Sequence, residues 1–488
     1  MNKPVRHIAI FAGTLVLALL AQATWLQFGR ADELAGHEKN RRVRINAYAH
    51  PRGNIIVGGE PVTGSVPTTG GDLKYKRSYT DGARYAPVTG FSSQTFGSNQ
   101  LEYVYDKFLS GTDDRLFLQR TTDLFTGRKP RGGDVVTTID PNAQQAAVKG
   151  LGKYKGAVVA IEPSTGRILA LASTPSYDPS AIAGEGRQDQ RTWQRLEADK
   201  DGKPLSNKAI KELYPAGSTF KILTAAAALD HGLYTDIDAP TDSPYPWNLP
   251  DTVTPMKNEN ESAPCRNASL KVAMQYSCNN VFAKIAAELG KDKMRETAEK
   301  FGFNQQVDMP VRVTGSVYPK DLNRPQTALT GIGQGSLAAT PFQVAMMTAA
   351  LANDGKLMKP HLVDKLRGPD LSTVQEFKPE RMSQAVSPDT ARKVQRMMEF
   401  TAKEGTGKAA LIDGVTVGGK TGTAQHGANL EKIPYAWFVS YAKQDDGSPV
   451  AVAVFIDPEG SGVDRAHVSG GGLAGPIAKQ VMRAVLKK

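Results

Sequence analysis

The sequence is poor in cysteine, in clustered histidine and in long apolar runs, and each shortage excludes a class of protein. Two cysteines among 488 residues are too few for a disulfide framework or a four-cysteine zinc site. The seven histidines show neither an H-E-x-x-H pattern nor zinc spacing to a cysteine. We therefore expect no metal and no organic cofactor. Only one stretch, at the N-terminus, is long and apolar enough to span a bilayer, so a polytopic membrane protein is excluded.

Acidic residues are also fewer than basic ones, 49 against 60, which gives a formal net charge of +11. A basic surplus suits nucleic acid, an anionic membrane or a cell-wall polymer. The basic residues form no patch interleaved with aromatics, so nucleic acid is disfavoured as a partner. Hydrophobic residues at 40% and charged residues at 22% are typical of a globular protein. The length suggests about three domains.

The apolar stretch covers residues 8–28, which is long enough to cross a bilayer as one helix. Lys3 and Arg6 precede it without an acid between them, which favours a cytoplasmic N-terminus. The flank from Arg30 to Arg44 is basic as well and dilutes this preference. Ala21-Gln22-Ala23 also fits a signal-peptidase site, so cleavage stays open. In both cases the chain after this span, about 460 residues, is expected outside the cytoplasm.

An extracytoplasmic location affects the expected state of Cys265 and Cys278. An oxidising compartment permits a disulfide between them. Their spacing alone fixes no geometry, so two free thiols remain the alternative.

The organisation along the chain changes at about residue 150. Residues 62–99 are rich in Gly, Thr, Ser and Tyr and predict short strands and turns rather than a helical core. Two apolar runs around Ser164-Thr165-Gly166 then predict a β-hairpin. Strand-like runs at the end of the chain would complete one sheet with it, giving an α/β domain whose sheet joins its own termini. We expect helices at 100–109, 142–149, 219–230, 272–289, 341–353, 391–401 and 475–486, and strands at 135–139, 415–423, 436–442 and 450–456.

The first candidate for chemistry is Ser218 with Lys221, in the run P-A-G-S-T-F-K. Pro and Gly end the preceding structure, so Ser218 is predicted at a helix start with Lys221 on the same face. A serine hydroxyl is a weak nucleophile until a base takes its proton. A lysine can be that base only when burial or a neighbouring cation lowers its pKa. The same spelling recurs at Ser440 and Lys443 on a strand-like run, where positions i and i+3 point to opposite faces, and we discard it.

Two further short patterns follow in the chain. Ser277 and Asn279 are separated by one residue and can face one direction on extended backbone, which supplies a hydroxyl and an amide. Lys420-Thr421-Gly422-Thr423 follows a β-branched run. The lysine could hold a carboxylate, the glycine would let a substrate backbone lie close, and a backbone N–H could join an oxyanion hole. Each pattern alone has a structural explanation.

A competing motif overlaps the last one. Residues 414–421 spell G-x-x-x-x-G-K-T, the pattern of a phosphate-binding loop. Such a loop needs a helix after it, whereas Gly422 and Gly427 follow closely. Too little chain remains for a nucleotide-binding sheet, and ATP is scarce outside the cell. We therefore reject this interpretation.

The order S-x-x-K, S-x-N, K-T-G is the motif set of penicillin-binding proteins and class A β-lactamases. The chain resembles the class B penicillin-binding proteins over nearly its whole length. Further similar segments are R-G-N-I at 52–55, L-E-x-x-Y-D-x-x-L-S-G at 101–111, G-Q-G at 333–335, T-P-F-Q at 340–343 and Trp437-Phe438. One departure is Asn99-Gln100, where the family usually has a glycine before Leu-Glu; it concerns the N-terminal domain and not the chemistry.

The resemblance implies an α/β fold: a serine β-lactamase-like transpeptidase domain, with an antiparallel sheet flanked by helices, behind a β-rich pedestal. The expected division is a cytoplasmic tail and membrane anchor at 1–28, a pedestal (dimerisation-like) domain at 29–150 and the transpeptidase domain at 151–488. The implied location is the cell membrane, single-pass, with the catalytic domain on the extracytoplasmic side.

The resemblance also implies an activity, peptidoglycan D,D-transpeptidation. Ser218 would attack the stem peptide between its last two D-alanines, Lys221 would act as base and Ser277 would relay a proton to the leaving amine. Asn279 would bind the peptide amide, and the Lys420-to-Thr423 segment would bind the terminal carboxylate. The N–H groups of Ser218 and Thr423 would form the oxyanion hole. The implied partners are stem peptides ending in D-Ala-D-Ala, β-lactams as covalent inhibitors, and division or wall-synthesis proteins.

Of four alternatives, two are disfavoured and two stay open. A class A protein would need a mostly helical glycosyltransferase domain, which residues 62–99 do not resemble, and a β-lactamase would lack the pedestal and anchor. A D,D-carboxypeptidase, which uses water as acceptor, is left open. So is a septal scaffold protein with a minor catalytic role, although the intact motif set argues against it.

Overall fold

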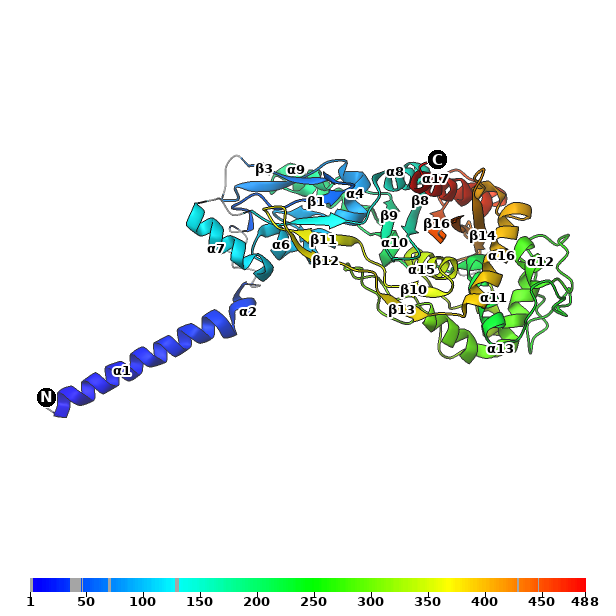
Figure 1. Ribbon diagram of the computed structural model, residues 1–488, viewed down its shortest axis with the longest axis horizontal. Helices are drawn as coiled ribbons and strands as arrows, with labels where there is room; N and C mark the ends of the chain where they lie inside the picture. The colour runs from blue at the N-terminus through cyan, green and yellow to red at the C-terminus, as the bar shows by residue number, and fades with distance from the viewer. Residues whose placement is uncertain are drawn as a thin grey trace.

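The computed structural model describes residues 3–35, 45, 47–68, 72–127, 131–427, 430–445 and 447–488. Most of the basic flank predicted after the apolar stretch, from Lys39 to Arg44, lies outside these residues. Within them the chain has three parts in a row: a long N-terminal helix, a smaller β-containing pedestal and a larger C-terminal domain (Figure 1).

The N-terminal part is helix α1 (Lys3–Thr24), continued by a π-turn (Trp25–Gly29) and a short helix α2 (Ala31–Ala35). The apolar run Lys3–Gly29 is the one candidate membrane span in the described residues, and it buries nothing against the rest of the protein. Its exposed apolar surface is what a helix shows when lipid is its natural surrounding.

The pedestal is built around a five-stranded mixed sheet with the order β12-β11-β7-β1-β2. Two of these strands, β11 and β12, come from late in the chain and form a hairpin that reaches back into the pedestal (Figure 1). The sheet is therefore not confined to residues 29–150. Its elements are β1 (Ile55–Val57), β2 (Glu60–Pro61), β7 (Asp134–Thr137), β11 (Val363–Arg367) and β12 (Thr373–Glu376).

Two-stranded ladders and short helices complete the pedestal. The turn-rich stretch 62–99 does contain short strands, as predicted, but it also contains helix α4, which the sequence did not predict. Most of that helix is buried, so packing overrides its weak helical pattern. The remaining elements are β3 (Thr63–Pro67), β4 (Tyr75–Tyr79), α4 (Gly82–Thr89), β5 (Ser92–Ser93), β6 (Gly97–Ser98), α5 (Gln100–Val104), α6 (Asp106–Ser110) and α7 (Phe117–Thr126).

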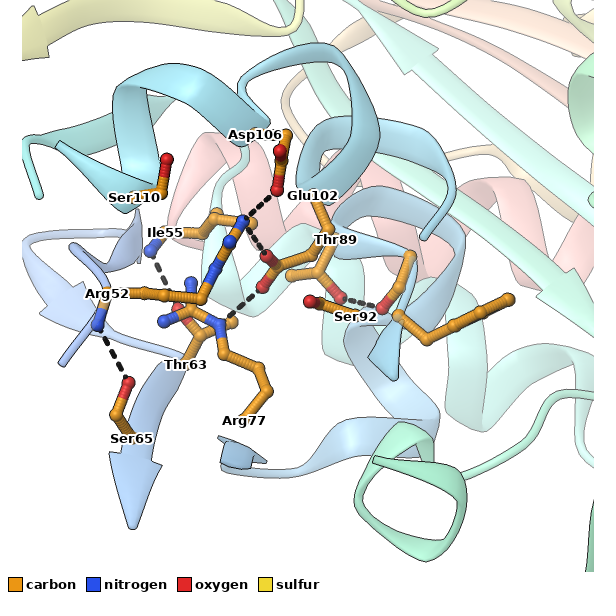
Figure 2. Close-up of polar contacts among 12 residues, drawn as sticks. Arg52, Ile55, Thr63, Ser65, Arg77, Thr89, Ser92, Glu102, Asp106 and Ser110 are labelled. Atoms are coloured by element: carbon orange, nitrogen blue, oxygen red, sulfur yellow. Dashed lines mark hydrogen bonds and ion pairs between the residues drawn. The ribbon is translucent and has the colours of Figure 1, made fainter. Parts of the chain in front are cut away.

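A buried ion cluster lies inside the pedestal (Figure 2). The carboxylate of Glu102 accepts from Arg77 Nε at 2.5 Å and from Arg52 Nη2 at 3.4 Å. Arg52 also contacts Asp106 at 2.9 Å, and that second acid is half exposed. Arg52 belongs to the R-G-N-I segment and Glu102 and Asp106 to the L-E-x-x-Y-D segment, whereas Arg77 comes from strand β4. The two segments therefore fix the pedestal through buried charge rather than contributing to chemistry.

The C-terminal domain is organised by an antiparallel sheet with the order β14-β15-β16-β8-β9. The sheet joins the two ends of the domain, as the sequence predicts. Alternate side chains divide between two cores, because strand neighbours point to opposite faces. The strands are β8 (Lys155–Ile161), β9 (Ile168–Thr174), β14 (Thr416–Ala424), β15 (Tyr435–Gln444) and β16 (Gly447–Asp457).

Helices cover both faces of this sheet. On one face lie α8 (Pro141–Leu151) and α17 (Gly475–Leu486). Asp140 caps α8 and Pro141 opens it, the arrangement that fixed φ favours at a first turn. The other face carries most of the domain. Its helices include α11 (Lys221–Asp230), α12 (Leu270–Tyr276), α13 (Asn279–Lys300), α14 (Arg324–Thr330), α15 (Pro341–Ala352) and α16 (Pro388–Glu404). The domain also contains the shorter or outer elements α9 (Arg187–Ala198), α10 (Lys208–Lys211), β10 (Lys356–Met358) and β13 (Arg381–Gln384).

Two predicted helices are each divided in the structure. The run 100–109 was expected as one helix but forms α5 and α6, which are separated at Tyr105. The run 272–289 was expected as a single helix, but the chain ends α12 at Tyr276 and begins α13 at Asn279. Ser277, between them, has a left-handed backbone with φ of +60°. The apolar spacing continues across the break, so the periodicity could not show it.

Candidate active site

Ser218 lies on a 3₁₀ turn (Gly217–Phe220) that leads directly into α11. The turn packs against the end of β14 through Gly217, whose φ is +55°. A Cβ on Gly217 would lie 2.8 Å from the carbonyl oxygen of Thr423. Only glycine meets both demands, so the sequence places the serine hydroxyl beside the K-T-G strand.

Lys221 begins α11 and is completely buried. Its ammonium nitrogen lies 2.7 Å from the carbonyl oxygen of Ser277, 3.0 Å from Ser277 Oγ and 2.6 Å from Asn279 Oδ1. No carboxylate is among these partners. The lysine is held by neutral oxygens alone, which orient it without stabilising its charge as an acid would.

The Ser277-to-Asn279 turn is held from behind by Asn258. Asn258 Oδ1 accepts from the backbone N–H of Asn279 at 2.6 Å, and the side chain of Asn279 donates to the carbonyl of Lys257 at 2.7 Å. The structure joins Cys278 to Cys265 in a disulfide, with Cα atoms 5.5 Å apart. These bonds fix a turn that the left-handed Ser277 would otherwise make unfavourable.

Lys420 reaches the same place from strand β14. Its ammonium nitrogen lies 2.9 Å from Ser277 Oγ and 3.0 Å from the carbonyl of Thr421. Two residues on, a Cβ on Gly422 would approach Thr219 Cγ2 and Trp437 Cβ to 2.9 Å. The glycine therefore lets the strand lie against the Ser218 turn.

Three distant segments thus meet at one hydroxyl, that of Ser277, which both lysine ammonium groups contact. Burial, followed by the charge of Lys420, holds the pKa of Lys221 well below its ordinary value, although Glu259 opposes the shift. Burial lowers the pKa of Lys420 to about 8, again against Glu259. A neutral Lys221 beside a charged Lys420 is the combination that a general base needs.

An open cleft of about 970 Å³ adjoins this cluster. Ser218, Asn279 and Thr423 line it, whereas Lys221, Ser277 and Lys420 lie behind its wall. Thr421 does not line the cleft; its hydroxyl pairs with that of Thr406 at 2.9 Å. The structure therefore brings together all the predicted site residues except the Thr421 side chain.

Several cleft residues carried no signal in the sequence. Asn258 and Glu259 belong to an irregular loop, and only the fold brings them to Ser218. His426 lines the cleft and stacks on Tyr435 with ring centroids 3.7 Å apart. No motif in the sequence distinguishes this histidine from the other six. G-Q-G also acquires a role, because Gln334 and Gly335 line the cleft and Gly333 packs on Gly217.

The G-x-x-x-x-G-K-T spelling has no phosphate-loop geometry. Residues 416–424 form one continuous strand paired with β15, and no helix follows within the described residues up to 445. The rejection made from sequence context is confirmed.

Comparison with known proteins agrees with this geometry. Residues 156–483 match the model of the penicillin binding protein transpeptidase domain, and residues 52–135 match the penicillin binding protein A dimerisation domain. The peptidoglycan D,D-transpeptidase PbpA of Mycolicibacterium smegmatis is 40% identical, over 100% of both chains. Stage V sporulation protein D of Bacillus subtilis is 30% identical, over 84% of this chain and 65% of its own.

Solved structures extend the likeness to three dimensions. Penicillin-binding protein A from M. tuberculosis, as a ceftriaxone acyl-enzyme complex, superposes with a TM-score of 0.84 at 40% identity, covering 91% of this chain and all of that one. A D,D-transpeptidase domain from Eggerthella lenta gives a TM-score of 0.75 at 30% identity, covering 90% of this chain and 98% of that one. The resemblance read from the motifs is confirmed: the chain belongs to the class B penicillin-binding proteins.

Proposed function

We propose that the protein is a peptidoglycan D,D-transpeptidase that works through an acyl-enzyme on Ser218. The observation that carries this proposal is the meeting of Lys221 and Lys420 on the hydroxyl of Ser277, at 3.0 and 2.9 Å. It links the three motifs into one proton-transfer unit behind a cleft that Ser218 lines. The relatives' names and the acyl-enzyme complex of the M. tuberculosis structure support the same chemistry.

The acylation step assigns each group a task. Ser218 Oγ attacks the carbonyl carbon between the last two D-alanines as its proton passes to neutral Lys221. The N–H groups of Ser218 and Thr423 stabilise the oxyanion. The C–N bond then breaks, and the leaving amine takes a proton through the Ser277 hydroxyl. D-Alanine departs and the serine ester remains.

Substrate binding falls to the cleft wall. Asn279 would bind the peptide amide, Thr423 would receive the terminal carboxylate, and Lys420 would supply the positive charge behind it. A group buried behind the wall acts over a few ångströms without a direct contact. The same charge lowers the pKa of Lys221, so Lys420 would serve both binding and basicity.

Deacylation by an amine from a neighbouring stem peptide would complete the cross-link. A β-lactam opens on the same serine and leaves no small amine to depart, so it would stall there. A carboxypeptidase would use the same residues with water as acceptor. Purified protein given a D-Ala-D-Ala peptide and an amine acceptor separates the two: a cross-linked product supports transpeptidation, and free acid alone contradicts it.

Replacing the nucleophile tests the assignment itself. We expect Ser218→Ala to abolish covalent labelling by fluorescent penicillin while the melting temperature is kept. Mass spectrometry of the wild-type adduct should place the mass on the peptide containing Ser218. A labelled Ser218→Ala protein would contradict the nucleophile assignment.

We also propose that α1 anchors the protein in the cell membrane, with a cytoplasmic N-terminus and the cleft outside, and that the enzyme serves cell division together with other wall-synthesis proteins. The length and composition of α1 support the anchor. Depletion followed by complementation with Ser218→Ala tests the division role. Rescue by this variant would favour a scaffold function instead.

A further inference from the structure

Helix α7 of the pedestal turns its apolar side outward. Phe117, Leu118 and Phe125 are 60%, 81% and 84% exposed. At about 100° per residue these three lie on one side of the helix, with Thr121 between them. A surface helix of a globular protein normally buries that side, so α7 is inverted.

The polar side of α7 faces the protein. Asp123 is buried, Arg120 Nη1 donates to the carbonyl of Thr112 at 2.9 Å, and Gln119 donates to the carboxylate of Asp370. These contacts fix the rotation of the helix. The outward direction of the phenylalanines and the leucine is therefore set by the structure rather than by a lack of partners.

A second element brings an exposed apolar side chain close to α7. Asp370, held by Gln119, lies in the turn between β11 and β12, and the next residue is Leu371. Leu371 is 65% exposed and has a left-handed backbone with φ of +70°, a conformation that is unfavourable for a leucine. An exposed leucine in an unfavourable conformation stabilises nothing within the chain. Phe117, Leu118, Phe125 and Leu371 together are called the apolar tip.

Helix α7, which carries three of the four residues of the apolar tip, lies at the end of the pedestal from which α2 and α1 leave, the end opposite the transpeptidase domain (Figure 1). The chain has joined the pedestal by Tyr48, whose carbonyl accepts from Tyr75 at 3.1 Å. Five residues on, the backbone of Gly53 donates to the carbonyl of Leu109 in α6 at 2.8 Å, and α7 follows shortly after α6. From Ala35 to Ile45 the chain has ten residue steps, which reach at most about 36 Å. The tip is thus close to wherever α1 leaves a bilayer.

We propose that the apolar tip inserts into the outer surface of the membrane that α1 spans. Phe and Leu on one side of a helix, with polar groups on the other, is the composition of helices that lie in the interface. The inference rests on the proposed membrane anchor. A second attachment beside α1 holds the pedestal at a fixed tilt, and so fixes the direction in which the cleft faces.

The test uses the full chain in lipid nanodiscs of phosphatidylcholine and phosphatidylglycerol. Both cysteines of the sequence are in the disulfide, so one introduced cysteine is a unique site for a bimane label. Leu118→Cys, Phe125→Cys and Leu371→Cys report the tip. Thr126→Cys is the matched control on α7, because Thr126 is exposed and takes no part in the contacts that fix the helix. Val253→Cys, 91% exposed, is the control on the transpeptidase domain.

We expect the three tip labels to shift to shorter emission wavelength in nanodiscs and to be quenched when nitroxide lipid is included. Insertion to about 5–10 Å should give at least roughly twofold quenching at the tip and none at either control. Equal quenching at residues 118 and 126, or none at all, would overturn the proposal. Quenching at the tip that requires a second labelled copy of the chain, and not nitroxide lipid, would also overturn the proposal. In that case the tip would be a protein interface.

Two parallel measurements keep the results separable. Co-elution of the chain with nanodiscs reports the α1 anchor. If the chain does not co-elute, both the proposed anchor and the proposed insertion are contradicted. Labelling by fluorescent penicillin reports the fold and the acylation chemistry of each variant. Full labelling without quenching would therefore contradict the apolar tip proposal alone and leave the transpeptidase function intact.

Discussion

The transpeptidase site and the pedestal each bury two cations, but they hold them in opposite ways. Lys221 and Lys420 contact only hydroxyl, amide and peptide oxygens. Arg52 and Arg77 enclose the buried carboxylate of Glu102. Burial lowers the pKa of the lysines, whereas for Arg52 the charges of the two acids outweigh burial and raise its pKa. Residue type and counter-ion together decide which cluster can move a proton.

The difference matches the tasks. A buried arginine stays charged and binds a carboxylate in a fixed geometry, so the pedestal cluster is a permanent cross-link. A buried lysine without an acid can release its proton near neutral pH, so the site cluster is a base. The predictions below change one charge at a time.

The largest effect is expected for Lys221→Met. It removes the base and keeps the apolar stem, so acylation by penicillin should fall about 10²- to 10⁴-fold with little change in melting temperature. The measurement is the second-order rate of labelling. Lys443→Met is the matched control, because this lysine belongs to the second S-x-x-K spelling and lies on β15, away from the cleft. An equal loss in both variants would contradict the assignment of the base.

The next effect is on stability. Glu102→Gln leaves two arginines buried without their carboxylate, and we expect a loss of about 3–5 kcal/mol in the free energy of unfolding of the pedestal. Denaturant melts followed by fluorescence measure it. The acylation rate per folded molecule should stay unchanged. A slower acylation with intact stability would show that the pedestal cluster acts on the site instead.

The sequence predicted the transpeptidase core better than the pedestal, for a physical reason. Helix α17 has the predicted bounds and Pro141 opens α8, because capping and apolar period are local signals. The return of β11 and β12 to the pedestal sheet is a pairing of residues hundreds of positions apart, and no local pattern specifies it. The burial of Glu102 is also set by such contacts.

The motif residues of the site were predicted, but the residues and backbone turns that hold them in place were not. Three short patterns identified Ser218, Ser277 and Lys420 because their order is characteristic. Asn258, which holds the Ser277 turn, is a lone asparagine in a loop, and the left-handed Ser277 interrupts a run that reads as one helix. Backbone breaks and loop contacts depend on tertiary structure, so sequence reasoning missed both.

A smaller effect is expected for Glu259→Gln, which removes a negative charge that acts on the two lysines of the active site. Glu259 is the acid that raises the pKa values of Lys221 and Lys420 against burial. Removing it should lower both, so Lys221 becomes neutral at lower pH and Lys420 loses its charge below its present pKa of about 8. The whole pH–rate profile of acylation should therefore move to lower pH.

At alkaline pH the variant should therefore acylate more slowly than the wild type, because Lys420 has lost more of its charge. Glu261→Gln, two residues on and also exposed, is the control and should leave the profile in place. A profile that moves to higher pH would show that Glu259 acts by another route.

The smallest effect is expected for Asp106→Asn, the partner of Arg52 that faces solvent. Its side chain is half exposed and its contact with Arg52 is 2.9 Å, so water screens the pair and an asparagine can still accept the hydrogen bond. We expect at most about 1 kcal/mol of destabilisation, measured in the same melts as Glu102→Gln. Glu102 should keep Arg52 in place in this variant. A loss as large as that of Glu102→Gln would mean that both acids are required to hold the arginines, and that the pedestal cluster works as one network rather than as one buried pair with an exposed neighbour.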